Sequence, residues 1–331
     1  MDFVSKMKAK AKSMRKKLVL PEGTDSRTIK AARILMDEQL AVSVTLLGKA
    51  ADIQKVAEDE GVDLSGVNII SPHADVNLNK YAQEYYELRK HKGMTGEQAK
   101  IDITDPLRWG AMMVHLDAAD AMVAGAENTT GDVLRAGLAI IGTLPGLKTA
   151  SSCFVMANMD PQWGADGALI FSDCAVVPDP TAEQLADIAE SAARSCREFL
   201  GLEPVVALMS FSTKGSAKHD DVTKVQTAVE FLKGKNPDFI FDGELQADAA
   251  LVPSVTDKKA PGSPVRGKVN TLVFPDLGSG NIGYKLVQRL GKAEAFGPFL
   301  QGFAKPISDL SRGASVDDIV TTAAVTLSRV K

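Results

Sequence analysis

The chain has 331 residues, of which 45% are hydrophobic and 24% charged, and its formal net charge is −4. This length predicts two domains, and the small negative charge gives no reason to expect a nucleic-acid or membrane-surface partner. Three cysteines in so long a chain do not form a disulfide framework, so we expect a reducing compartment. The basic N-terminal segment lacks the apolar core of a signal peptide, and no apolar run reaches the roughly 20 residues of a membrane helix. We therefore expect a cytoplasmic protein without a membrane partner.

Short aliphatic runs alternate with helical patterns in the first half of the chain. After a solvated N-terminal helix, the pattern predicts strands at 18–21, 42–48, 67–71 and 121–126, and helices at 28–41, 52–60, 80–92, 105–116 and 130–141. Such alternation is typical of a parallel sheet that helices cover on both faces.

The second half begins with two strand candidates that have no helix between them. These runs, at 149–159 and 167–176, could pair antiparallel. The pattern then predicts a strong helix at 181–201, strands at 205–211, 239–241 and 269–274, and a last amphipathic helix at 315–331. The run 143–146, Thr-Leu-Pro-Gly, is a plausible domain boundary. The fold class expected is α/β with mostly parallel sheets.

A glycine-rich run from Gly278 to Gly283 matches the dinucleotide fingerprint GxGxxG. That fingerprint requires a βαβ unit whose next strand ends in an acidic residue. The helix at 284–290 leads instead to Phe-Gly-Pro-Phe at 296–299, where no such strand follows. We therefore interpret the run as a strand-to-helix turn and not as a nicotinamide site. No GxxxxGK[ST] loop predicts ATP-type phosphoryl transfer either.

Histidines and cysteines give no sign of a metal site or a thiol nucleophile. The four histidines are scattered without metal-ligand spacing, so we expect no metal. Cys196 lies on an apolar helix stripe, where a free cysteine usually packs. Cys153 and Cys174 have no sequence-near histidine to activate them. We expect all three thiols to be buried.

The tail of the chain has the densest group of candidate residues. Ser311, Arg312 and Asp318 flank the start of the last predicted helix, where backbone N–H groups favour anions. Ser315-x-x-Asp318 is also a capping box, in which Asp318 satisfies a backbone donor. The spacing alone favours the cap.

For two arginines and a threonine elsewhere in the chain, a ligand-binding role likewise competes with an ordinary structural one. Arg89 lies near the end of a predicted helix, where a cation is electrostatically favourable. Arg135 lies one turn inside the helix that follows a strand, and Thr130 lies at the end of that strand, where open α/β sheets bind ligands. Taken singly, each arginine is more often an ordinary solvated side chain.

Several sequence runs, in order between about residues 18 and 320, favour a functional role for these residues over an ordinary structural one. They are Leu-Pro-Glu-Gly at 20–23 with Asp25 and Arg27, Met122–Ala126, Asp132–Arg135, Phe211–Ser216, Asp242–Gln246 with Asp248, Phe274–Leu277, Gly280–Lys285 and Asp309–Gly313. The combination resembles the phosphate acetyltransferase (phosphotransacetylase) members of the phosphate acetyl/butyryltransferase family. A glycine-rich run at 278–283 belongs to that family's pattern, which accounts for the false fingerprint.

The resemblance implies two α/β/α domains with the active site in the cleft between them, and a homodimer. We expect residues 1–145 plus 301–331 to form one domain and 146–300 the other. By the same resemblance, Asp318 is the general base, Ser311 is its hydrogen-bonding neighbour, and Arg312, Arg135 and Arg89 bind anions. Ala314 replaces a cysteine that some relatives carry, so the chemistry cannot depend on a thiol there.

The implied reaction is reversible acetyl transfer between acetyl phosphate and coenzyme A, which is a substrate, so no permanently bound cofactor is expected. The pKa of a free thiol exceeds that of an ordinary aspartic acid by about 4.6 units, or roughly 6 kcal/mol for complete proton transfer. Arginines must therefore favour the thiolate and the departing phosphate while the base removes the proton. Direct attack in a ternary complex, with the two substrates held together, requires no metal.

Three alternatives remain open at this point. A phosphate propionyl- or butyryltransferase would differ in the width of its acyl pocket. A catalytically silent acetyl-CoA-sensing domain would not need the intact Ser311, Arg312 and Asp318. A dehydrogenase of similar architecture would need the fingerprint context that fails above.

Overall fold

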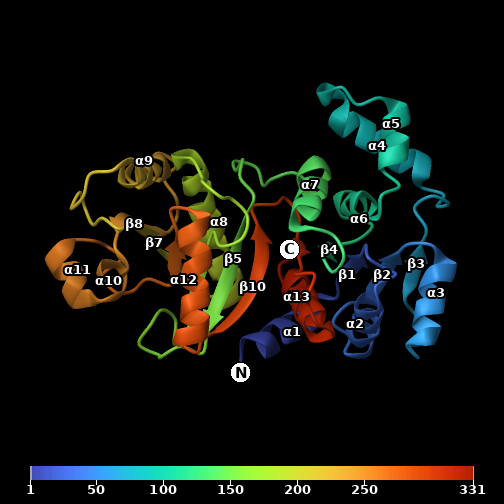
Figure 1. Ribbon diagram of the computed structural model, residues 1–331, viewed down its shortest axis with the longest axis horizontal. Coiled ribbons are helices and arrows are strands. Elements are labelled where there is room, and N and C mark those ends of the chain that lie inside the picture. Colours follow the sequence, from blue (N-terminus) through green and yellow to red (C-terminus); the bar gives the residue numbers. More distant parts are fainter. Residues whose placement is uncertain (1, 331) are drawn as a thin grey trace. The chain divides into compact units, whose positions relative to one another are not determined.

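The computed structural model describes residues 2–330 and has two compact units (Figure 1). The first unit comprises Met1–Leu144 and Phe303–Lys331, and the second comprises Pro145–Gly302. The expected divisions fell after residues 145 and 300, whereas those of the structure fall after residues 144 and 302.

The first unit is built on a sheet of five parallel strands in the order β11-β4-β1-β2-β3. Its strands are β1 (Lys17–Leu20), β2 (Ser43–Leu47), β3 (Asn68–Ile70), β4 (Ala121–Ala124) and β11 (Ile307–Asp309). Its helices are α1 (Phe3–Met14), α2 (Ser26–Asp37), α3 (Ala50–Asp59), α4 (Leu78–Arg89) with the 3₁₀ turn η1 (Lys90–Lys92), α5 (Gly96–Asp102), α6 (Pro106–His115), α7 (Thr130–Ile140) and α13 (Val316–Leu327). The parallel sheet and the predicted elements of this half are confirmed, except that the N-terminal helix is not solvated on all sides, because Met7 and Ala11 are buried. The helix α5 and the strand β11 were not predicted.

Helices cover both faces of this sheet, which explains why its strands are continuous aliphatic runs. Figure 1 shows α1, α2 and α13 below the sheet and α6 and α7 above it. Successive side chains of a strand point to opposite faces, so Leu18 and Leu20 join the core between the sheet and the helices α2 and α13. Val19 lies between them on β1 and is buried as well.

The second unit contains a mixed sheet of six strands in the order β10-β5-β6-β9-β7-β8. The strands are β5 (Ser151–Ala157), β6 (Leu169–Ser172), β7 (Val205–Met209), β8 (Ile240–Leu245), β9 (Thr271–Val273) and β10 (Glu294–Gln301). Between them lie α8 (Ala182–Leu200), α9 (Asp220–Gly234), α10 (Ala247–Leu251), α11 (Pro253–Lys259) and α12 (Leu277–Leu290). The antiparallel pairing of β5 with β6 is confirmed.

The strand β10 was not predicted, because Gly297 and Pro298 interrupt its pattern. It lies at the edge of the sheet and pairs antiparallel with β5, with a register shift between Phe296 and Phe299. An edge position tolerates a proline that would break an inner strand.

The glycine-rich run at 278–283 lies inside α12, so its interpretation as a turn was wrong. Asp276 caps this helix by accepting the Ser279 backbone N–H at 2.7 Å. A Cβ added at Gly280 would lie 2.2 Å from the Asp173 carbonyl oxygen, so glycine is required where the helix packs against the loop after β6. The next strand, β10, is antiparallel to β5 and forms no βαβ unit with β9. The glycines therefore serve helix packing.

Within residues 2–330, no helix is both long enough and apolar enough to cross a membrane.

Candidate functional site

Three loops of the first unit meet at the carboxyl ends of β1, β4 and β11. The strand order continues from β1 to β2 and β3 on one side, whereas β4 and β11 lie on the other. Open α/β sheets bind ligands at such a reversal, outside the carboxyl ends of the strands. We call the loops at 21–25, 125–129 and 310–315 the three-loop site.

Glu22, from the loop after β1, anchors the loop after β4. Its carboxylate accepts the backbone N–H groups of four successive residues at 2.8–3.1 Å and the side-chain amide of Asn128 at 2.9 Å; the four are Gly125, Ala126, Glu127 and Asn128. The side chain is only 5% exposed. A buried carboxylate needs such donors, because burial without them carries a large desolvation cost. Glu22 therefore fixes the course of the chain between β4 and α7.

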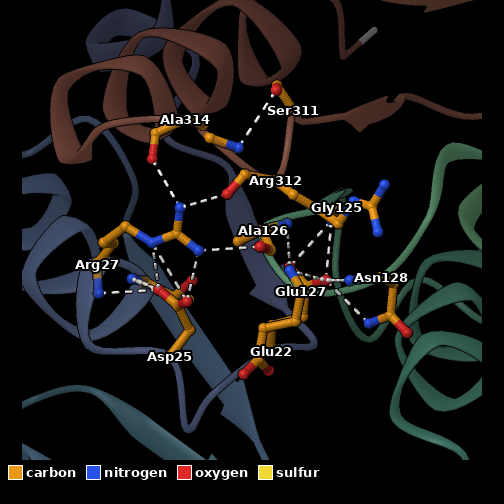
Figure 2. Close-up of polar contacts among 12 residues, drawn as sticks. Glu22, Asp25, Arg27, Gly125, Ala126, Glu127, Asn128, Ser311, Arg312 and Ala314 are labelled. Atoms are coloured by element: carbon orange, nitrogen blue, oxygen red, sulfur yellow. Dashed lines mark hydrogen bonds and ion pairs between the residues drawn. The ribbon is translucent and has the colours of Figure 1, made fainter.

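Arg27 joins all three loops, as Figure 2 shows. Its guanidinium pairs with Asp25 at 2.7 Å and donates to the Ala126 carbonyl at 2.9 Å. Its other terminal nitrogen donates to the carbonyls of Arg312 at 2.8 Å and Ala314 at 2.9 Å. The planar fork of five donors in arginine suits such bridging. Arg27 therefore holds the loop at 310–315, called the tail loop below, in place.

Gly125 allows the loops after β4 and β11 to approach closely. Its φ is +114°, in the region that favours glycine. A Cβ added there would lie 2.6 Å from Asp309 Oδ1 and from the backbone nitrogen and oxygen of Leu310. Any side chain would push the tail loop away from β4.

The tail loop brings the predicted Ser311 and Arg312 to this site. The Ala314 N–H donates to the Ser311 carbonyl at 2.8 Å, which closes a turn, and Ser311 Oγ accepts the Gly313 N–H at 3.3 Å. Ser311 and Arg312 are both exposed. Among residues 2–330, no group hydrogen-bonds the Arg312 guanidinium, so that cation is available to an anionic ligand.

Asp318 forms the capping box that its spacing predicts. Its Oδ2 accepts from the Ser315 N–H at 2.9 Å and the Ser315 hydroxyl at 2.8 Å, and its own N–H donates to Ser315 Oγ at 3.1 Å. The side chain is exposed, and no described residue hydrogen-bonds its Oδ1. The part of the chain that the structure describes has no hydrogen bond between Ser311 and Asp318. The cap uses one carboxylate oxygen and leaves the other available.

The two remaining predicted arginines differ in their surroundings. Arg89 is the last residue of α4, and its Nε is buried without a hydrogen-bond partner in the described chain. Arg135 lies on α7, pairs with Asp132 one turn earlier, and is 73% exposed. A buried donor without a partner is costly, so Arg89 has the stronger structural case for an external ligand.

Asp309, which was not predicted as a site residue, directly precedes the loop at 310–315 of the three-loop site. It ends β11 beside Ala124 and accepts the Thr130 hydroxyl at 2.5 Å. The pKa of Asp309 is raised to about 6, mainly by burial and in part by the nearby Glu22 charge, against the hydrogen bond from Thr130. The residue belongs to the motif at 309–313, but its burial depends on the unpredicted strand β11.

All three cysteines are free and buried, as predicted. Burial raises the pKa of Cys196 to about 11 and that of Cys174 well above its ordinary value, and the Asp173 charge adds to the second shift. A thiolate is the reactive form, so both thiols are held in the unreactive state.

Two family-like runs in the second unit bind each other at the carboxyl ends of β7 and β8. Glu244 accepts the Ser212 hydroxyl at 2.9 Å and the Gly215 N–H at 2.7 Å. Lys214 pairs with Asp242 and donates to the Gly243 carbonyl at 2.8 Å. These contacts order the loop at 210–217 and account structurally for the motifs.

The parallel sheet and the three-loop site define an open α/β protein with a candidate ligand site at its strand ends. The family model for phosphate acetyl/butaryl transferase matches residues 2–327, and the chain belongs to that family. A phosphate acetyltransferase of Treponema pallidum is 59% identical over 99% of this chain and 98% of its own length. A crystal structure of a phosphotransacetylase from Streptococcus pyogenes has a TM-score of 0.92 at 41% identity, covering 99% of this chain and 98% of that one. The EutD phosphotransacetylase of Staphylococcus aureus has a TM-score of 0.89 at 40% identity, covering 99% of both chains.

Proposed function

We propose that this protein is a phosphate acetyltransferase, which transfers an acetyl group reversibly between acetyl phosphate and coenzyme A. The observation that carries the proposal is the full-length match to relatives of that name at identities of 59% and 51%. The geometry adds a tail loop held at the carboxyl ends of the sheet, with the Arg312 cation free for an anionic substrate.

The proposed chemistry is direct attack of the coenzyme A thiolate on the carbonyl carbon of acetyl phosphate. The new C–S bond forms as the C–O bond to phosphate breaks, and phosphate departs with the bonding electrons. Asp318 accepts the thiol proton, which its Oδ1 can do because the capping box occupies Oδ2. Ser311, on the loop that precedes α13, hydrogen-bonds the reacting groups. Arg312, Arg89 and Arg135 stabilise the phosphate and the developing negative charge.

The proposal includes no metal and no permanently bound cofactor, since the two substrates and the side chains supply every group that reacts. We further propose a homodimer in the cytoplasm. The three free cysteines support a reducing compartment, and the dimer follows from the family resemblance.

The test measures coenzyme A-dependent phosphate release from acetyl, propionyl and butyryl phosphate. We expect acetyl phosphate to have the highest kcat/KM; a preference for butyryl phosphate would replace the acetyl assignment within the same chemistry. No release from any of the three would overturn the proposed function.

The variant Asp318→Asn separates the base from the cap. Asparagine can still accept the Ser315 N–H, so we expect stability to be kept while kcat falls by the roughly 10²–10⁴ typical of a lost general base. The matched control is Asp317→Asn, because Asp317 is also exposed in the first turn of α13 but has no hydrogen-bond partner among the described residues. Equal activity in both variants would leave Asp318 with a capping role alone.

A further inference from the structure

The side chains of Thr130 and Asp309, which flank two loops of the three-loop site, are joined by one hydrogen bond. Thr130 is the first residue of α7, and Asp309 is the last residue of β11. The Thr130 hydroxyl lies 2.5 Å from Asp309 Oδ2, although the two residues are 179 positions apart. Asp309 is 4% exposed, whereas Thr130 is only partly buried and can reach a ligand.

Within residues 2–330, no cation compensates the charge of Asp309. Its Oδ1 is buried without a hydrogen-bond partner in residues 2–330. The charged group that faces it from the loop after β1 is Glu22, whose carboxylate already accepts the N–H groups of the loop after β4. Ala124 of β4 pairs with Asp309 in the sheet, Gly125 lies against its Oδ1, and Thr130 of α7 donates to its Oδ2; none of the three is charged. Across the described chain, no lysine or arginine pairs with Asp309.

Hydrogen-bond direction follows from the single proton of the threonine hydroxyl. An ionised carboxylate only accepts, so Thr130 must then donate its proton to Asp309 and offers only lone pairs to a ligand. A neutral Asp309 has a proton of its own to donate to Thr130, which frees the Thr130 proton for a second partner. A phosphate oxygen needs a donor, whereas the thiol and amide groups of coenzyme A can donate to an acceptor.

We propose that Asp309 is a positioning residue that sets the hydrogen-bond direction of Thr130 toward the substrate. With Asp309 ionised, Thr130 accepts from a donor group of coenzyme A and cannot donate to a phosphate oxygen; with Asp309 neutral, it donates to the anion. This inference rests on the proposed function and makes Thr130 a hydrogen-bond acceptor toward the substrate at neutral pH.

Burial and the Glu22 charge raise the pKa of Asp309 to about 6, so the change in hydrogen-bond direction can be measured in an accessible pH range. The carboxylate form predominates in neutral solution, and the neutral form appears as the pH falls through about 6.

The first test measures sulfate binding to the full chain by calorimetry between about pH 5 and pH 8. Sulfate keeps its charge over this range, so a pH dependence belongs to the protein. We expect wild-type affinity to rise about tenfold as the pH falls, which is the effect of one charge-assisted hydrogen bond. Asp309→Asn should bind with the low-pH affinity throughout, because its amide can donate to Thr130. Thr130→Val should lose the rise, and Thr130→Ser should keep it.

Two further measurements separate this inference from neighbouring explanations. In turnover assays at neutral pH, Asp309→Asn should raise KM for coenzyme A and lower KM for acetyl phosphate, with a smaller change in kcat; a merely structural role would move both KM values in the same direction. The difference in Tm between Asp309→Asn and wild type should increase between about pH 4 and pH 6. The reason is that a raised native pKa makes the wild type lose stability as the pH rises through this window.

The outcomes are distinguishable from failure of the proposed function, because calorimetry does not require turnover. Absence of sulfate binding to the wild type, or the same pH dependence in Asp309→Asn, would overturn the inference. If Asp309→Asn does not fold, the comparison of wild type with Thr130→Val decides the question, and an unchanged pH dependence in Thr130→Val contradicts the proposal.

Discussion

Replacement of Glu22 by glutamine should destabilise the first unit, although the two side chains have nearly the same shape. The Glu22 carboxylate receives the Ala126 N–H at 2.8 Å and the Gly125 N–H at 2.9 Å on Oε2, and three further N–H groups on Oε1. A glutamine offers one acceptor oxygen and directs an NH₂ group at the donors on the other side. In its better orientation it opposes the N–H groups of Gly125 and Ala126.

The expected magnitude comes from these two donors. Each buried donor left unsatisfied costs about 1–3 kcal/mol, so we expect Glu22→Gln to lower the free energy of unfolding by about 2–6 kcal/mol. Total stabilities are about 5–15 kcal/mol, so this is a large fraction. The loop between β4 and α7 should also become mobile, and acetyl transfer should fall with it.

The assay uses the tryptophans, of which the chain has two. Trp109 is buried in the first unit, so in a Trp163→Phe background its fluorescence reports urea unfolding of that unit alone. Native-state hydrogen exchange at residues 125–128 then measures the loop directly.

The matched control is Glu127→Gln in the same loop. The Glu127 side chain is exposed and accepts no hydrogen bond within residues 2–330. Partial burial, followed by the Asp25 and Glu22 charges, raises its pKa, so the neutral substitute should leave stability within about 0.5 kcal/mol or improve it slightly. Equal effects of the two substitutions would refute the role given to Glu22.

Two predictions concern the proposed chemistry. Arg89→Ala and Arg135→Ala should each lower kcat/KM for acetyl phosphate more than they lower stability. Arg89→Ala should have the larger effect, because Arg135 already pairs with Asp132. Unchanged kinetics in both variants would exclude the two arginines from the site. Initial rates measured against both substrates should give intersecting double-reciprocal lines, as expected for direct transfer in a ternary complex. A folded variant with alanine at Cys153, Cys174 and Cys196 should keep substantial activity, because all three thiols are buried. Parallel lines, or a folded but inactive triple variant, would indicate an acyl-thiol intermediate.

Local contacts of the candidate site could be predicted from the sequence. Ser315 and Asp318 are three residues apart, and the capping box they form involves only one turn of helix. The burial of Cys196 followed from the apolar stripe of a helix that the 3.6-residue period identified. The fold class followed from the alternation of aliphatic runs and helical patterns, because buried parallel strands require such runs.

The sequence by itself therefore determined the α/β class, most of the elements, the capping box and the motifs that indicate the family. Only the tertiary structure showed that Glu22 binds the loop at 125–128, that Arg27 joins three loops, and that Asp309 is buried against Thr130. These partners lie between 99 and 287 residues apart in the chain. Hydrogen bonds within one turn follow from neighbouring residues, whereas these contacts depend on the order in which β1, β4 and β11 join the sheet. The strand order depends on how helices bury both faces of the sheet, and a short stretch of sequence does not reveal this arrangement.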